Sequence, residues 1–98
     1  MKRFHDLPEQ IQDGIRRLHQ DLSQLAIDPS ITWREQDRCA ELRDGLSYAL
    51  QAHGQYPVVN LWETLMGVSQ RPYGGHSNPT RQECAKTARQ LLDEIESL

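Results

Sequence analysis

The sequence predicts an all-α protein, a compact four-helix arrangement with three longer helices and one short helix. Two segments carry apolar residues at alternating intervals of four and three positions, the spacing of a helix that buries one stripe. Prolines and glycines bound the apolar segments, as expected at helix ends. No run of alternating apolar and polar residues is long enough to indicate a strand. With 98 residues the chain has the length of one domain, so we expect residues 1–98 to form a single helical domain.

The first helix is expected from about Leu7 to Ile27. Asp6 resembles an N-cap, and Pro29 stops the helix because the residue before a proline is disfavoured in the α region. Gly14 and His19 fall on the side that we expect to be exposed. The buried stripe is expected to contain Ile11, Ile15, Leu18, Leu22 and Leu25.

The second helix is expected from about Trp33 to His53, with Gly54 after it as a C-terminal stop. Thr32 and Glu35 have the spacing of a capping box. The first turns are strongly polar apart from Trp33, so we expect this end to project into solvent. The apolar face is expected to contain Cys39, Leu42, Leu46, Ala49 and Leu50.

The third helix is short, about Pro57 to Met66, with Gly67 following. Its apolar side chains cover an arc of about 160°, wider than the roughly 100° that a surface helix needs. This helix is therefore expected either to be wedged between two others or to be partly committed to a partner. Residues 68–78 are expected to form the long loop.

The fourth helix is expected from about Pro79 to Ser97, with Asn78 as its N-cap. Its stripe of Cys84, Ala88, Leu91, Ile95 and Leu98 repeats the four–three spacing of the first helix. Matching stripes predict that these two helices pack on each other, with the second helix alongside and the third closing one end.

Composition excludes several classes of function. Eleven basic and fourteen acidic residues give a net charge of −3, whereas nucleic-acid binders carry a basic face, so no nucleic-acid partner is expected. No stretch approaches the length of a membrane span, so no membrane partner is expected either. Cys39 and Cys84 both fall on apolar helix faces, which predicts buried thiols in a reducing compartment, the cytoplasm, rather than a disulfide.

The motifs of catalysis and metal binding are missing from the sequence. There is no C-x-x-C, H-x-x-x-H or H-E-x-x-H spacing for zinc, and no G-x-S-x-G nucleophile elbow. We therefore expect a protein that is not an enzyme and that holds no metal or cofactor.

Gly74 and Gly75 lead into the start of the fourth helix, where backbone N–H groups could face an anion. Arg71 and Arg81 are near in sequence and could add positive charge. This supports an alternative function, binding of a phosphorylated small ligand or nucleotide at this loop and helix start.

A partner-binding surface is the function that the sequence favours. Arg71, Tyr73 and His76 stand in the polar 68–78 loop, and Arg and Tyr often anchor interfaces. Trp62, on the wide apolar face of the third helix, could extend the surface. We expect a small regulatory, inhibitor or adaptor protein that binds another protein, and, because so short a chain buries little apolar area, a homodimer.

Overall fold

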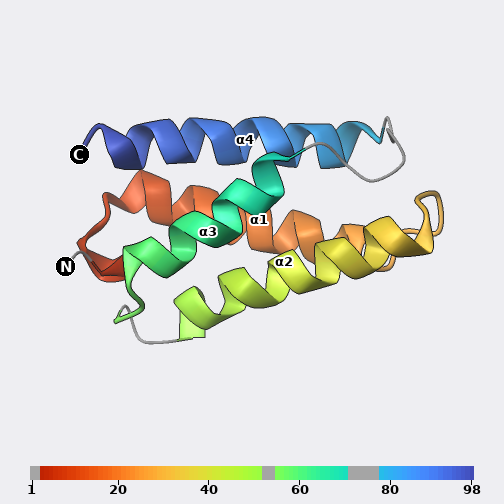
Figure 1. The fold of residues 1–98 in the computed structure, drawn as a ribbon, viewed down its shortest axis with the longest axis horizontal. Helices are drawn as coiled ribbons and strands as arrows, with labels where there is room; N and C mark the ends of the chain where they lie inside the picture. Colours follow the sequence, from red (N-terminus) through yellow and green to blue (C-terminus); the bar gives the residue numbers. More distant parts are fainter. Residues whose placement is uncertain (1–2, 52–54, 71–77) are drawn as a thin grey trace.

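The computed structural model describes residues 3–51, 55–70 and 78–98, which form four α-helices and one 3-10 turn. After the turn η1 (Phe4–Asp6), the helices are α1 (Glu9–Leu25), α2 (Trp33–Gln51), α3 (Val58–Ser69) and α4 (Pro79–Glu96). α1 and α3 run one way along the molecule and α2 and α4 run the other way, so α2 and α4 both begin toward the same end (Figure 1). The predicted all-α, four-helix arrangement is confirmed.

The helices pack as two pairs, α1 with α2 and α3 with α4, and each pair contacts the other through α1 with α4 and α2 with α3. The predicted contact between α1 and α4 is present, and α2 lies along α1. The third helix does not close one end, as the sequence analysis expected. Instead, α3 crosses the molecule obliquely and packs on both α2 and α4 (Figure 1). These two neighbours bury Val58, Leu61 and Leu65 of its wide apolar face, whereas Val59 and Met66 remain exposed.

The first helix is bounded differently from the prediction. It begins after Pro8, and Asp6 is not its N-cap, because the Asp6 carboxylate accepts a hydrogen bond from the Arg3 backbone N–H at 3.0 Å. Phe4, which the sequence analysis did not assign, is buried, and its N–H donates to the Tyr56 carbonyl at 2.9 Å. The helix ends at Leu25 because the chain tightens there into 3-10-type hydrogen bonds.

The predicted caps of the next helices fit better. Thr32 Oγ1 accepts from the Glu35 N–H at 3.3 Å at the start of α2. Asn78 Oδ1 accepts from the Arg81 N–H at 3.0 Å at the start of α4, which confirms Asn78 as the N-cap. The predicted last turn of α2 at His53 and its stop at Gly54 lie outside the described residues.

The third helix is longer than predicted. Gly67 does not end it, since the helix continues through Val68 to Ser69. A Cβ at Gly67 would lie 2.7 Å from Leu42 Cδ2, so glycine lets α3 approach α2 closely. The sequence analysis interpreted Gly67 as a helix stop, whereas this glycine makes room for the contact between α3 and α2.

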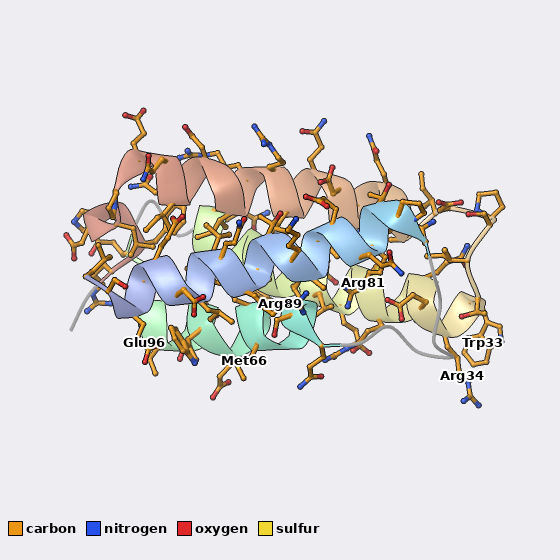
Figure 2. The ribbon with its side chains drawn as sticks, turned by 90° about the horizontal axis from the view of Figure 1, so that it is seen from above. Trp33, Arg34, Met66, Arg81, Arg89 and Glu96 are labelled. Carbon is orange, nitrogen blue, oxygen red and sulfur yellow. The ribbon has the colours of Figure 1, made fainter. Side chains whose placement is uncertain are left out.

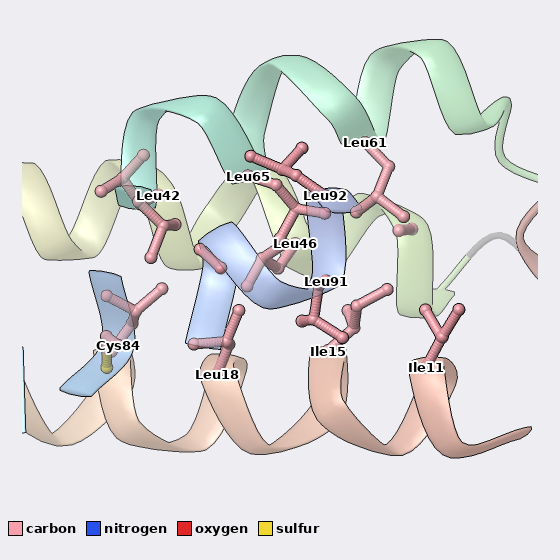
Figure 3. Packing of buried hydrophobic residues seen from close by; sticks show 14 of the residues in the cluster. Ile11, Ile15, Leu18, Leu42, Leu46, Leu61, Leu65, Cys84, Leu91 and Leu92 are labelled. Atoms are coloured by element: carbon pink, nitrogen blue, oxygen red, sulfur yellow. The ribbon is translucent and has the colours of Figure 1, made fainter. Parts of the chain in front are cut away.

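The core joins all four helices, with side chains of α1 and α4 facing those of α2 and α3 (Figure 3). Both predicted stripes are buried from Ile11 to Leu25 and from Cys84 to Ile95, whereas Leu98 is exposed. Gly14, expected on the exposed side, instead faces α4, because a Cβ there would lie 2.9 Å from Leu91 Cδ2. No helix in the described part of the chain is long and apolar enough to cross a membrane.

Candidate functional site

The structure describes one of the four side chains that the sequence analysis proposed for partner binding. Arg71, Tyr73 and His76, together with Gly74 and Gly75, lie outside the described residues. Trp62 on α3 is half-buried and packs against the core. Most of its surface is therefore occupied within the protein.

A more exposed aromatic side chain stands at the start of α2. Trp33 is the first residue of that helix and is 67% exposed. Together with Arg34, Arg38 and Glu41 it lines an open hollow of about 280 Å³, which we call the α2 hollow. Figure 2 shows Trp33 and Arg34 at one end of the molecule, with Glu96 toward the other.

The α2 hollow contains two differently held guanidinium groups. The Arg34 guanidinium lies over the Trp33 ring, 5.5 Å from its centroid, which is within cation–π range. Arg38 Nη1 pairs with Glu41 Oε2 at 3.3 Å. Arg38 also lies against α3, where a Cβ at Gly67 would be 3.0 Å from its Nη2. Arg38 is thus fixed between two helices, whereas Arg34 is held by the aromatic ring.

A buried ion pair lies on the core side of the same end of α2. Arg81 Nε donates to Glu35 Oε1 at 2.7 Å, and their side chains are only 2% and 1% exposed. Arg81 also donates to the carbonyls of Val68 and Gln70, at 2.9 and 3.4 Å. One guanidinium therefore joins α2, the end of α3 and the start of α4.

This pair corrects two expectations. The start of α2 does not simply project into solvent, because Glu35 faces the core while Trp33 and Arg34 face outward. Arg81, proposed to add charge to an anion site at the start of α4, is directed inward and is bonded to Glu35. The alternative ligand site therefore loses this cation, and its other proposed residues, Arg71 and the two glycines, lie outside the described residues.

The two cysteines are buried and free, as the sequence analysis predicted. Burial raises the pKa of the Cys39 thiol from 9.0 to about 12 and that of Cys84 to about 11. The Cys39 thiol also donates to Glu35 Oε1 at 3.7 Å. Because the thiolate is the nucleophile, both groups are inert near neutral pH.

His19 was expected on the surface, but it is half-buried between α1 and α2. Its Nε2 lies 2.7 Å from Ser47 Oγ, and that hydroxyl donates to the Arg43 carbonyl at 3.0 Å. Which of the two atoms donates in the His19–Ser47 contact depends on the tautomer of His19. In either case the contact links α1 to α2.

Within residues 3–51, 55–70 and 78–98, no three or more His, Cys, Asp and Glu side chains gather as they would around a metal ion. No family model, curated protein or solved structure matches this chain. The interpretation of the site therefore rests on its own geometry.

The sequence contains signals for Trp33 and for the Glu35–Arg81 pair. At 100° per residue, Trp33 lies roughly 150° from the centre of the buried face of α2, which indicates exposure. Glu35 precedes Cys39 by four residues and Arg81 precedes Cys84 by three, so each charge extends an apolar stripe by one position. Two opposite charges on two buried stripes indicate a buried ion pair.

Proposed function

We propose that this protein is a small, non-enzymatic regulator, inhibitor or adaptor that acts by occupying the surface of a partner protein. The observation that carries the proposal is the α2 hollow, where Trp33 is 67% exposed beneath the Arg34 guanidinium. Trp and Arg are the side chains most often found as energetic anchors in interfaces.

The attachment of the start of α2 to the neighbouring helices supports the same function. Trp33 and Arg34 stand in the first turn of a helix whose other side is tied to α3 and α4 through the Glu35–Arg81 pair. An anchor that is already held in place loses less conformational entropy on binding. A protein that acts by surface contact alone benefits from this arrangement.

Two further features belong to the proposal. The buried, free thiols support a reducing compartment, and we place the protein in the cytoplasm. The outer side of α3 exposes Val59 and Met66 near half-buried Trp62. This apolar strip supports a homodimer, and sedimentation at micromolar concentration tests it, since a monomer there would refute dimerisation.

The test of the function uses paired variants of exposed aromatic residues on one helix. Tagged protein, the Trp33→Ala variant and the Tyr48→Ala variant are used to capture partners, and a captured protein is then purified and titrated against each. Tyr48 is the matched control because it is 64% exposed on α2 but does not line the α2 hollow. We expect Trp33→Ala to weaken binding at least about 30-fold, equivalent to about 2 kcal/mol, and Tyr48→Ala to leave it unchanged. Equal affinity of both variants would refute the role of the α2 hollow.

The alternative function, binding of a phosphorylated small ligand at Gly74, Gly75 and the start of α4, has a separate test. A ligand that prefers the native state raises the melting temperature by mass action. A thermal-shift screen with nucleotides that gives a clear upward shift would favour it over the partner-binding function.

A further inference from the structure

We propose that the α2 hollow binds an acidic segment of the partner, in which a carboxylate side chain stands beside an apolar one. This inference rests on the proposed function, because it names the chemistry of the partner that the same surface would bind. Three observations carry it, namely the charge of the hollow, the position of the Trp33 ring, and the size and openness of the depression.

Among the described residues, the side chains that line the α2 hollow carry a net positive charge. Two guanidinium groups, those of Arg34 and Arg38, are opposed by one carboxylate, that of Glu41, which is paired to Arg38. Among the described residues Arg34 forms no ion pair, and its partner is the Trp33 ring. Asp37 is exposed on the same helix but does not line the hollow. A carboxylate from outside would therefore complete the charge balance at Arg34.

The helix itself adds to this positive potential. The α2 hollow lies over the first turns of α2, where unpaired backbone N–H groups give a partial positive charge. This partial charge adds to the attraction that the Arg34 and Arg38 side chains define.

The Trp33 ring specifies the rest of the ligand. Its large exposed surface lies beside Arg34, so a group that contacts both must present a carboxylate and an apolar surface within a few ångströms of each other. A hollow of about 280 Å³ that opens to solvent holds one or two side chains. Sites for small ligands usually bury most of their ligand, which a hollow open to solvent does not do. A segment of a protein fits this shape better than a small cofactor does.

The direct experiment uses Trp33 as the reporter. The Trp62→Phe variant retains one tryptophan, so acrylamide quenching then measures the accessibility of Trp33 alone. The probe is a short synthetic peptide in which glutamates flank a single leucine, and the control is the same peptide with lysine in place of glutamate. Should Trp62→Phe lower the thermal stability, the Trp33 indole N–H resonance in the unaltered chain reports the same event.

We expect the acidic peptide to protect Trp33 from acrylamide and the lysine peptide to leave quenching unchanged. Raising salt from about 50 to about 500 mM should weaken the acidic peptide at least tenfold, since exposed charges are screened. Arg34→Glu should abolish binding of the acidic peptide, while Arg17→Glu, at an exposed arginine of α1, retains most of it. Equal binding of both peptides, or of single-stranded DNA as well as the acidic peptide, would overturn the inference.

The two proposals can fail separately. A captured partner that needs Trp33 but tolerates high salt and Arg34→Glu would refute the acidic segment and leave the proposed function standing. Peptide binding as described, with no partner that depends on Trp33, would support the acidic ligand and refute the proposed function. A dimer that Trp33→Ala converts to a monomer would show that the hollow binds a second copy of this chain, and would overturn the acidic-segment inference.

Discussion

The buried ion pair gives the sharpest prediction about stability. In the Arg81→Met variant the Glu35 carboxylate stays in the core without its cation, and the Val68 carbonyl loses the donor that lies 2.9 Å away. Breaking one side of a buried pair typically costs about 3–5 kcal/mol. Because domains of this kind are stable by only about 5–15 kcal/mol, this loss is a large share of the total.

Replacing both partners should cost less than replacing one. Glu35→Leu combined with Arg81→Met removes both charges, and buried pairs replaced by apolar side chains are often neutral or stabilising by about 1–4 kcal/mol. The Val68 carbonyl still loses its donor, at a cost of about 1–3 kcal/mol. We therefore expect the double variant to lie within about 2 kcal/mol of the original protein, well below the sum of the single losses.

Urea titrations followed by circular dichroism measure these free energies of unfolding. Arg16→Met is the matched control, because Arg16 pairs with Asp13 at 2.8 Å but both side chains are more than half exposed. We expect it to cost less than about 1 kcal/mol, as exposed ion pairs do. The reasoning would be refuted if Arg81→Met lowered the free energy of unfolding by less than about 1 kcal/mol. It would also be refuted if the double variant lost as much free energy of unfolding as the two single variants together.

Two further predictions concern the core. A Cβ at Gly45 would lie 2.7 Å from Thr64 Oγ1 and 2.9 Å from Thr64 Cγ2. Gly45→Ala should therefore destabilise the protein by about 1–3 kcal/mol, although alanine has a higher helix propensity than glycine. Adding Thr64→Ala should recover the loss, and a Gly45→Ala variant more stable than the original protein would contradict this. The raised thiol pKa values, about 12 for Cys39 and about 11 for Cys84, favour the native state below pH 9. Above the unfolded thiol pKa of 9.0 this contribution falls by about 1.4 kcal/mol per pH unit for each thiol. The decline in melting temperature above pH 9 should therefore be shallower in the Cys39→Ala/Cys84→Ala variant, and an identical decline would count against it.

The interface candidates show how far sequence reasoning reached for the site. It proposed that arginine and aromatic side chains form a docking surface at Arg71, Tyr73, His76 and Trp62, and the first three lie outside the described residues. The structure places Trp62 half in the core and shows Trp33 beside Arg34 in an open hollow. Contacts with α2 and α4 account for most of the wide apolar arc of α3, whereas Val59 and Met66 of that arc remain exposed.

The sequence by itself determined the helices and the stripes that they bury. Asn78 and Thr32 cap helices where expected, and the four–three spacing correctly placed Leu18 and Leu91 in the core. These features are local, because helix periodicity and capping depend on residues within one or two turns.

Only the tertiary structure decided which positions meet. Glu35 and Arg81 are 46 residues apart, and although each continues a buried stripe, only the arrangement of α2 and α4 in the fold shows that the two charges meet. Gly14 and Gly67 likewise resemble weak points or stops, whereas the neighbouring helices show them to be points of close approach. Local spacing fixes which face of a helix is buried. Whether a charged residue or a glycine on that face stabilises the protein depends on which side chains of the opposing helix lie against it.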